Sequence, residues 1–441
     1  MGVKLNELER SSDSVEMMPR SCWVRAKFSF GRWVFVQSPN SKVCFPKRAF
    51  ARMNTWRLLL ASSLALSVFQ ALPMRAAEGL GGSNSKESKS AASQQTSSPK
   101  TEAALSLVKI GSSPAASSAA LFLAEDFGYY RDEGLRVEFQ IFSGSTAPMV
   151  PLLARGELDV GGGNLTAGLF AAAEEKIEVL IVADKGSVRK NAQYSKLMVR
   201  EDLVASGQYK SPRDLKGLRI GLTATGTSQE AALGVILKSA GLKPQDVSLT
   251  KVSYADANRG FEAKNLDAAM QIEPYVAEAL KAKSARDVVS VFDVVPNHQS
   301  AAIFYSPKFA AEKTEISKKF MRAYVRACRA YNEALEAGPQ SAEFQKVIES
   351  LMKWTTVKDR EVYARMQPAG LERNCRLNMG SLKDDAAYYV SQGYLKSMPD
   401  LGRIAPSRYV DEAVADLDRK PKRPSKASVE PPSAAKTSKR R

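Results

Sequence analysis

Short apolar runs alternate with amphipathic runs from residue 105 to residue 417, and this alternation is the feature that most constrains the fold. In the first half of this region we predict strands at 105–111, 135–142, 158–163 and 177–183, with helices at 119–130, at 148–155 and from residue 165. A strand–helix–strand order needs crossover connections, and it favours a mainly parallel sheet covered by helices on both faces. The sequence therefore predicts a protein of the α/β class.

A second set of the same elements follows the first. We predict strands at 218–222, 247–252, 266–271 and 287–292, and helices at 227–240, at 256–263 and from residue 274. Two extended stretches, 193–200 and 297–306, lead into and out of this set, and residues 317–417 read as mostly helical. The pattern predicts two α/β lobes joined by two crossover strands with a ligand cleft between them, which is the build of a hinge-bending binding protein.

The excess of Lys and Arg over Asp and Glu is confined to the two ends of the chain. Of the 64 Lys and Arg and the 47 Asp and Glu, residues 1–57 hold eleven and four, and residues 419–441 hold nine and one. The body of the chain keeps 44 basic and 42 acidic residues, so it is close to neutral. A nucleic-acid partner is therefore not expected.

A targeting segment accounts for part of the basic N-terminal region. Residues 53–79 combine Arg57, an apolar run too short to span a membrane, and small residues, as a secretory signal peptide does. We expect Met53 to be the initiator, which makes residues 1–52 a mis-assigned extension. The other predicted boundaries are 80–104 for a flexible linker, 105–196 for lobe 1, 197–296 for lobe 2, 297–418 for the return to lobe 1 with the C-terminal helices, and 419–441 for a disordered basic tail.

Cysteine and histidine are scarce, which limits the chemistry. After removal of the signal peptide only Cys328 and Cys375 remain, and they form either one disulfide or two separate buried thiols. His298 is the only histidine. We therefore expect no metal site, no cofactor and no serine–histidine triad.

Small and hydroxyl-bearing residues follow the predicted strands. In open α/β sheets ligands bind beyond the carboxyl ends of the strands, so these loops are expected to face the cleft. The ligand-binding residues that we predict are Ser112, Ser113, Gly144, Ser145, Thr146, Asn164, Thr166, Thr225, Gly226, Thr227, Ser228 and Glu273.

The stretch from Gly221 to Ser228 has the glycine spacing of a nucleotide-binding P-loop, but Thr227 stands where the lysine is needed. Thr227 and Glu230 instead match the S/T-x-x-E pattern of a helix capping box. Two interpretations stay open. The helix start binds an anion through its free N–H groups, or it is a capped start with no role in binding.

Four further residues also allow two interpretations each. Glu273 either bonds to the ligand or bridges the lobes, and Lys185 is either a counter-charge for an anion or a solvated hinge lysine. Tyr275 either stacks on a ligand ring or packs in the core. His298 either contacts the ligand or senses pH, or it only makes a hydrogen bond in the hinge.

Several segments together resemble the nitrate/sulfonate/taurine-type solute-binding proteins of ABC importers, an NMT1/THI5-like group that shares its fold with thiamin pyrimidine-precursor binding and synthase proteins. In chain order these segments are DFGYYRDEGLRVEF, LLARGELDVG, VADKGS, KLMVREDL, SPRDLKGLRIGLTATGTS, LDAAMQIEPYV and YYVSQGYL. The resemblance implies a class II periplasmic-binding-protein fold and a monomeric periplasmic receptor that delivers its ligand to an ABC permease in the inner membrane. It also implies that the strand-end loops line the cleft, with Glu273 at the border.

We therefore expect a non-enzymatic receptor that closes on a small organic anion of the sulfonate/taurine, nitrate or aromatic carboxylate type. The alternatives are a thiamin pyrimidine-precursor binding protein and a pyrimidine synthase-like enzyme on the same fold. Such synthases consume a histidine and a lysine and bind iron near a cysteine-rich motif, whereas this chain has one histidine and no cysteine cluster. The sensing domain of a transcription regulator would need a helix-turn-helix, which residues 1–106 do not provide.

Overall fold

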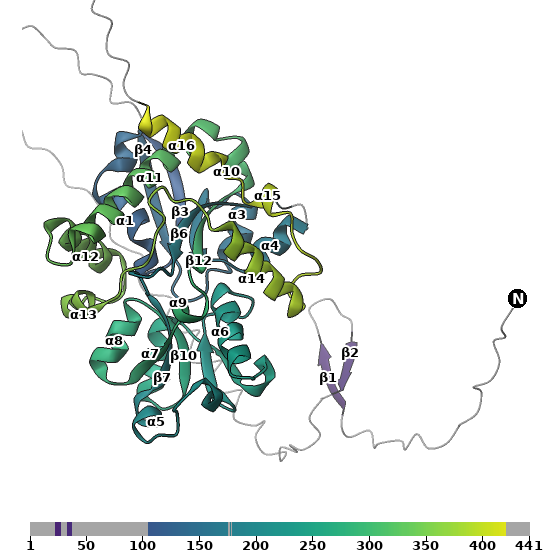
Figure 1. Cartoon of the computed structure of the whole chain (residues 1–441). Coiled ribbons are helices and arrows are strands. Elements are labelled where there is room, and N and C mark those ends of the chain that lie inside the picture. The colour runs from purple at the N-terminus through teal and green to yellow at the C-terminus, as the bar shows by residue number, and fades with distance from the viewer. Residues whose placement is uncertain (1–22, 28–32, 38–104, 175–176, 178, 420–441) are drawn as a thin grey trace, which may run out of the picture. The chain divides into compact units, whose positions relative to one another are not determined.

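The computed structural model describes residues 23–27, 33–37, 105–174, 177 and 179–419 (Figure 1). The chain divides into two compact units, residues 1–96 and residues 97–441. In the first unit β1 (Trp23–Lys27) pairs with β2 (Trp33–Gln37) in an antiparallel ladder that the sequence did not predict. The predicted signal peptide, the linker and all of the basic tail except Arg419 lie outside the described residues.

The second unit begins with lobe 1, whose five-stranded sheet has the order β4-β3-β5-β12-β6. Its strands are β3 (Ser106–Ser112), β4 (Leu135–Ile141), β5 (Val160–Asn164), β6 (Leu180–Ser187) and β12 (Gln299–Tyr305). β3 lies parallel to β4 and β5, whereas β12 runs antiparallel to β5 and β6.

Lobe 2 repeats this plan in a sheet of order β11-β7-β10-β8-β9. Its strands are β7 (Ser195–Arg200), β8 (Arg219–Leu222), β9 (Ser248–Lys251), β10 (Ala268–Ile272) and β11 (Ala285–Ser290). β8 lies parallel to β9 and β10, whereas β7 runs antiparallel to β10 and β11.

Four of the five strands in each sheet run in one direction, as the prediction of mainly parallel sheets requires, but β12 and β7 are reversed, which the sequence did not predict. The reason is the path of the chain between the lobes. β7 arrives from lobe 1 and β12 arrives from lobe 2, and each enters its sheet against the direction of the strands beside it. The two predicted crossings are both present, one between β6 and β7 and the other between α9 (Val291–Val294) and β12.

Helices cover both sheets. In lobe 1 they are α1 (Ala119–Asp126), α2 (Tyr129–Asp132), α3 (Met149–Ala154) and α4 (Ala167–Glu174). In lobe 2 they are α5 (Glu201–Ala205), α6 (Ser228–Ser239), α7 (Tyr254–Glu262), α8 (Tyr275–Ala282) and α9. The single helix predicted at 119–130 is interrupted, because Gly128 adopts a positive φ of 76° that stops α1 and lets α2 begin.

The C-terminal part is helical, as predicted. Its helices are α10 (Pro307–Ala311), α11 (Thr314–Ala337), α12 (Ala342–Trp354), α13 (Arg360–Arg365), α14 (Met379–Ser391), α15 (Leu401–Ile404) and α16 (Arg408–Asp418). α11 buries one face, including Phe320, Tyr324 and Tyr331, against α1 and α2 of lobe 1. A disulfide joins Cys328 of α11 to Cys375, so of the two interpretations left open for these cysteines the disulfide is the correct one.

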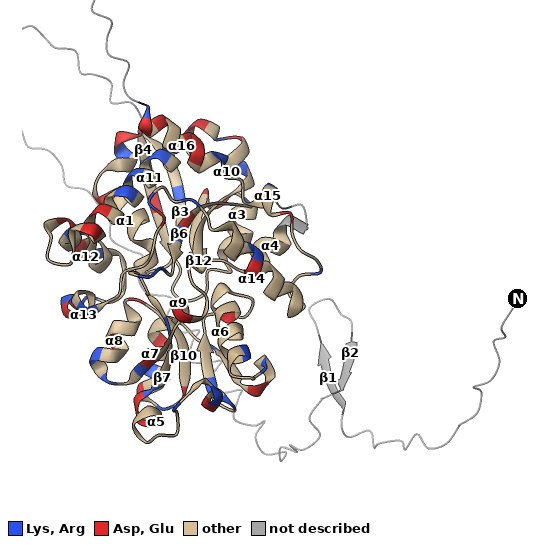
Figure 2. Ribbon diagram, viewed as in Figure 1, with Lys and Arg blue, Asp and Glu red and all other residues tan. Residues whose placement is uncertain are grey.

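The surface charges of the second unit are mixed in sign, as Figure 2 shows for its helices and loops. This agrees with the near-neutral body derived from the sequence. No helix among the described residues has the length and apolar character needed to cross a membrane.

Candidate functional site

The lobes contact each other where the loops after β5 and β8 meet. Thr166 and Thr227 form an isolated antiparallel bridge. The Ala167 N–H donates to the Gly226 carbonyl at 2.8 Å, and the Ser228 N–H donates to the Leu165 carbonyl at 3.0 Å. Both loops belong to the predicted site, and their backbone groups bond across the lobes.

The start of α6 is a capped helix end. Thr227 Oγ1 accepts the Glu230 N–H at 3.4 Å, and the Glu230 carboxylate accepts the Gly226 N–H. The hydroxyls of Tyr388 and Tyr394 also donate to Glu230. The predicted N-cap bond of Thr227 is confirmed, whereas Glu230 bonds to the N–H of Gly226 and not, as in a standard capping box, to that of Thr227. In this arrangement protein acceptors already bind the N–H groups of Gly226, Ser228 and Glu230, so an anion has little access to them.

Lys185 is a buried basic residue of lobe 1, next to the buried Asp184. Its side chain is 1% exposed, and its Nζ donates to Ser117 Oγ at 3.1 Å and to Ser113 Oγ at 3.3 Å. Among the described residues no carboxylate lies within ion-pair distance of Nζ. Burial lowers the pKa of Lys185 to about 7, and the charge of Asp184 opposes this shift. A buried ammonium held by hydroxyls alone is costly unless an anion compensates it.

The position of Lys185 differs from the prediction. The sequence placed it beyond a strand ending at residue 183, in a hinge, but β6 extends to Ser187 and contains it. Within β6 it falls at an irregularity, because Asp184 pairs with Ala302 and Gly186 pairs with the neighbouring Ala301. Such bulges re-aim a side chain and are frequent beside binding sites. The hinge interpretation is wrong, and the counter-charge interpretation stays open.

A run of glycines on β5 makes room for the polar side chains. A Cβ on Gly162 would lie 3.1 Å from Cδ and Cε of Lys185, and one on Gly163 would lie 2.4 Å from Thr146 Cγ2. Without these Cβ atoms, Lys185 and Thr146 pack directly against the strand backbone.

We expect Gly163→Ala to lower the free energy of unfolding by about 1–3 kcal/mol, because the added methyl group overlaps a buried β-branched side chain. The measurement is urea unfolding of the full chain. Gly168→Ala is the control, since its Cβ would meet nothing nearer than 3.7 Å and it lies in α4. Equal stability of the two variants would contradict the packing argument.

Further polar groups gather where the lobes meet. Asn164 Nδ2 of lobe 1 donates to the Tyr254 hydroxyl of lobe 2 at 3.2 Å, and this hydroxyl donates to Gln229 Oε1 at 3.1 Å. Some buried polar atoms have no protein partner, which is uncommon and leaves bonding capacity for a ligand or water. In this part of the molecule they include Thr146 Oγ1, Thr223 Oγ1, Gln271 Oε1 and Ser300 Oγ.

Glu273 bridges the lobes, which was one of its two interpretations. Its Oε2 accepts the Ala277 N–H at 2.9 Å, and its Oε1 accepts the Gln367 N–H at 3.0 Å. Its own carbonyl accepts the Ala116 N–H at 3.0 Å. Both carboxylate oxygens are therefore bonded to backbone groups.

Burial raises the pKa of Glu273 to about 7, although the two N–H donors oppose the shift. The folded state therefore holds a proton that the unfolded chain releases near 4.5, so this group's contribution to stability is lost as pH rises from about 4.5 through about 7. We expect Glu273→Gln to flatten the stability profile in this window, measured by urea unfolding across a pH series. Glu262→Gln, on an exposed position of α7, is the control that leaves the profile unchanged.

The other predicted site residues separate into two groups. Near Lys185, the Ser112 hydroxyl, which lies next to Ser113 in the sequence, donates to Ser118 Oγ at 3.1 Å.

The remaining predicted residues have no contact with Lys185 among the bonds of the described residues. Gly144 approaches Ser253, and Ser145 Oγ accepts the Ala147 N–H. Thr166 Oγ1 accepts the Leu169 N–H, Ser228 Oγ donates to the Ser300 carbonyl, and Thr225 is exposed. The structure thus brings Ser113 to Lys185 and uses Thr166, Thr227, Ser228 and Glu273 for structural bonds.

The structure also places His298 and Tyr275, for which the sequence left more than one interpretation open. His298 Nε2 lies 2.9 Å from Asp385 Oδ1, so His298 makes the hydrogen bond that one of its interpretations expected. The Tyr275 hydroxyl donates to the Pro114 carbonyl at 3.1 Å, and the buried ring stacks on Tyr254, which agrees with the core interpretation. Within the described ranges no group of three or more His, Cys, Asp and Glu residues could hold a metal ion.

Sequence reasoning missed Ser117, Gln229 and Tyr254 as site residues. Ser117 is the last residue of the hydroxyl-rich loop 111–117, so the argument that such loops after strands face the cleft could have included it. Tyr254 had no such signal, because it reaches Asn164 only through the pairing of the lobes.

Two α/β lobes with two crossings, and polar contacts between strand ends, define a periplasmic-binding-protein fold. The chain belongs to the NMT1/THI5-like family, whose model matches residues 115–337. The predictions of fold and family are confirmed.

The chain is also similar to individual proteins. It is 25% identical over 285 residues to a candidate binding protein of Brucella abortus strain 2308, a match that covers 63% of this chain and 83% of the relative. The alkanesulfonate-binding protein SsuA from Xanthomonas axonopodis pv. citri, bound to MOPS, matches with a TM-score of 0.53 and 21% identity, over 70% of this chain and 97% of SsuA. The periplasmic nitrate-binding protein NrtA from Synechocystis PCC 6803 matches with a TM-score of 0.57 and 14% identity, over 71% of this chain and 89% of NrtA.

Proposed function

We propose that this protein is the periplasmic solute-binding component of an ABC importer and that it closes its lobes on a small organic anion. The observation that carries the proposal is Lys185, a buried lysine whose Nζ bonds to two serine hydroxyls and, among the described residues, to no carboxylate. An anion in contact with Nζ supplies the missing counter-charge. The importer role is supported by family membership and by solved relatives named as sulfonate- and nitrate-binding proteins.

Hinge closure follows from the contacts between the lobes. Asn164, on β5, meets Tyr254, and the loops at Thr166 and Thr227 pair across the lobes. A ligand enclosed between them loses contact with water, so its selectivity comes from buried donors that a wrong ligand leaves unpaired. The receptor binds as a monomer, performs no covalent chemistry and hands the ligand to an inner-membrane permease.

The test is a thermal-shift screen of the full chain with taurine, alkyl and aryl sulfonates, aromatic carboxylates, nitrate and pyrimidines. A ligand at 100 times its dissociation constant adds about 2.7 kcal/mol of stability, which is readily measured. A rise in melting temperature with one class of anion supports the proposal and identifies the class of ligand. A shift confined to cationic pyrimidines would contradict the anion assignment and favour a pyrimidine-precursor receptor.

The affinity for the anion is expected to fall as the pH rises above about 7. The reason is that the pKa of Lys185 in the free protein lies at about 7 and a bound anion raises it, so binding takes up a proton. Between the two pKa values the affinity falls by about tenfold for each pH unit. The measurement is isothermal titration calorimetry of the anion with the largest thermal shift, in buffers of different ionisation enthalpy. A pH-independent affinity without proton uptake would contradict the assignment to Lys185.

A further inference from the structure

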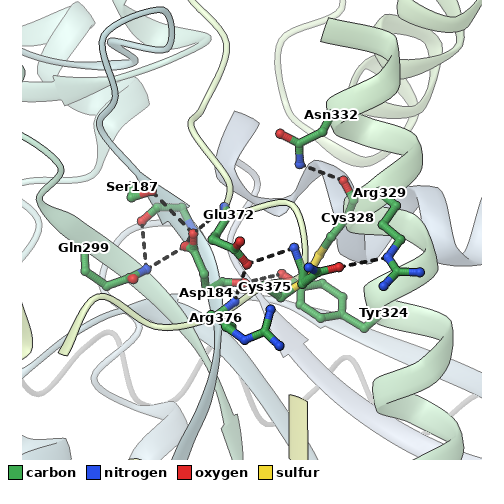
Figure 3. The surroundings of a disulfide bond; sticks show 12 residues. Asp184, Ser187, Gln299, Tyr324, Cys328, Arg329, Asn332, Glu372, Cys375 and Arg376 are labelled. Atoms are coloured by element: carbon green, nitrogen blue, oxygen red, sulfur yellow. Dashed lines mark hydrogen bonds between the residues drawn. A yellow bond between two sulfur atoms is a disulfide. The ribbon is translucent and has the colours of Figure 1, made fainter. Parts of the chain in front are cut away.

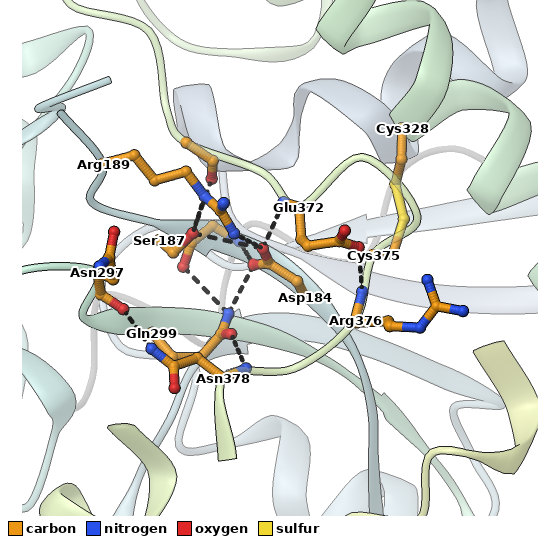
Figure 4. A network of polar contacts seen from close by, with 12 residues as sticks. Asp184, Ser187, Arg189, Asn297, Gln299, Cys328, Glu372, Cys375, Arg376 and Asn378 are labelled. Carbon is orange, nitrogen blue, oxygen red and sulfur yellow. Dashed lines mark hydrogen bonds and ion pairs between the residues drawn. A yellow bond between two sulfur atoms is a disulfide. The ribbon is translucent and has the colours of Figure 1, made fainter. Parts of the chain in front are cut away.

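Residues 367–378, between α13 and α14, run beside β6 and the start of β12 as a segment outside the helices and strands that we call the strap (Figures 3 and 4). α11 anchors it on one side. Besides the disulfide from Cys328 to Cys375, the Tyr331 hydroxyl donates to the Ala369 carbonyl at 2.8 Å. Arg329 Nε donates to Asn374 Oδ1 at 2.9 Å. The strap is therefore fixed to the longest helix of the fold.

On its other side the strap bonds to β6 immediately next to Lys185. The Asp184 N–H donates to the Cys375 carbonyl at 2.7 Å, and the Glu372 N–H donates to Asp184 Oδ2 at 2.8 Å. Two residues beyond Lys185, the Ser187 N–H donates to the Gly370 carbonyl at 2.8 Å. The strap thus holds the backbone on both sides of the lysine.

Asp184 is the centre of this network (Figure 4). Its carboxylate accepts the Gly186 N–H at 2.8 Å and the Gln299 amide at 2.6 Å, and Arg189 lies 3.7 Å away. The Tyr324 hydroxyl of α11 donates to its carbonyl at 2.8 Å. Asp184 is fully buried, so its conformation is set by these partners from β6, β12, α11 and the strap.

Lys185 needs such support because the sheet does not position it. Asp184 pairs with Ala302 and Gly186 with Ala301, so no β12 residue lies opposite Lys185. A bulged residue lacks the ladder bonds that fix an ordinary strand residue. The contacts that define its orientation are those of Asp184 on one face and of Ser113 and Ser117 on the other.

We propose that the disulfide-closed strap, acting through Asp184, is a positioning element of the anion site that holds Lys185 against Ser113 and Ser117. This inference rests on the proposed function, because it assigns a role to the strap at the same site. Cys375 and Asp184 are positioning residues, since the hydrogen-bond partners of Lys185 Nζ are Ser113 and Ser117. Cys375 itself adopts a positive φ of 61°, which the strap contacts around it must hold.

The test reads the amine of Lys185 directly and needs no ligand. Because the side chain is buried, its titration is followed without a reagent: NMR of the full chain with 13Cε-labelled lysine across a pH series, with the signal assigned through Lys185→Met, gives the titration midpoint of Lys185. The wild-type midpoint is expected near the pKa of about 7. In the Cys328→Ala/Cys375→Ala variant the lysine reaches water, and the midpoint is expected to rise by at least about one unit.

Asp184→Asn is expected to move the midpoint in the opposite direction. This variant keeps the backbone bond between residue 184 and the strap, from its N–H to the Cys375 carbonyl, so Lys185 stays buried. The charge of Asp184 raises the pKa of Lys185, so its loss lowers the midpoint, which a general loosening of the fold would not do. Ile236→Ala is the matched control, since it destabilises a buried position of α6 in lobe 2 without touching the strap. Its midpoint is expected to equal that of the wild type.

An unchanged midpoint in the double cysteine variant would overturn the proposal, and so would the same shift in Ile236→Ala. The result is independent of the proposed function. If no anion binds but the midpoints shift as expected, the strap positions the lysine and the anion assignment fails. If an anion binds but the midpoints do not move, the anion assignment stands and the strap does not position the lysine.

Discussion

Lys185→Met is expected to weaken binding of the anion found in the screen by about 2–5 kcal/mol, the usual cost of removing one partner of a buried charge pair. Methionine has nearly the length of the lysine stem but no charge and no N–H donor. A bound anion would then face Ser113 and Ser117 with its charge uncompensated. Calorimetry of wild type and variant at neutral pH measures the loss.

The control for this substitution is Lys190→Met in the first crossing. Lys190 is exposed, and the described residues provide no ion-pair partner for it, so its loss is expected to leave the affinity unchanged. Wild-type affinity in Lys185→Met would show that the anion binds elsewhere. Equal losses in both variants would point to a general electrostatic effect.

The same substitution is expected to stabilise the protein when no ligand is bound. The pKa of Lys185 is lowered from 10.5 to about 7, so the folded state binds fewer protons than the unfolded chain between these values. Wild-type stability therefore rises with pH across this window, and Lys185→Met removes the rise. The advantage of the variant is largest below about pH 7, where the wild type buries the full charge. A variant less stable than wild type at every pH would contradict this reasoning.

Local patterns predicted the elements of the fold and the common direction of most strands, but not the reversal of β7 and β12. Apolar periodicity located the strands because each strand buries its own side chains. The antiparallel entry of β7 and β12 depends on pairs far apart in the sequence, such as Ala268 with Val199 and Ala301 with Asn164. No periodicity within a single segment encodes such a pairing.

The same distinction explains the candidate site. The cap at Thr227 and Glu230 is a motif of four residues, so the sequence predicted it correctly. The Ser228 N–H donates to the Leu165 carbonyl. This hydrogen bond was not predictable, because Leu165 lies in the other lobe. Glu273 stayed ambiguous for the same reason, since the donor that decides its role is Gln367.

The burial of Lys185 is the clearest example of a feature that the sequence alone did not predict. Lysine is mostly exposed in proteins, so its residue type favours solvent. Its burial requires the bare backbone of Gly162 beside its stem, the bulge opposite β12 and the strap behind Asp184. These features come from three separate parts of the chain, and only the folded structure brings them together.

Loss of the disulfide is expected to lower the free energy of unfolding by about 4 kcal/mol. The bond closes a loop between residues 47 apart, and in the chain-entropy model a loop of this length restricts the unfolded state by about that amount. Urea unfolding of wild type and Cys328→Ala/Cys375→Ala measures the difference. The variant is also expected to show a larger m-value, because its unfolded chain exposes more surface.

Reduced wild type separates the cross-link from the packing of the sulfur atoms. Wild type that is unfolded, reduced with a dithiol and refolded keeps both sulfur atoms but lacks the bond, so it is expected to lose nearly as much stability as the double variant. A loss below about 1 kcal/mol in both forms would show that α11 and the segments after it already restrict the unfolded chain. A loss in the variant alone would assign the effect to the packing of Cys328 and Cys375, both of which are fully buried.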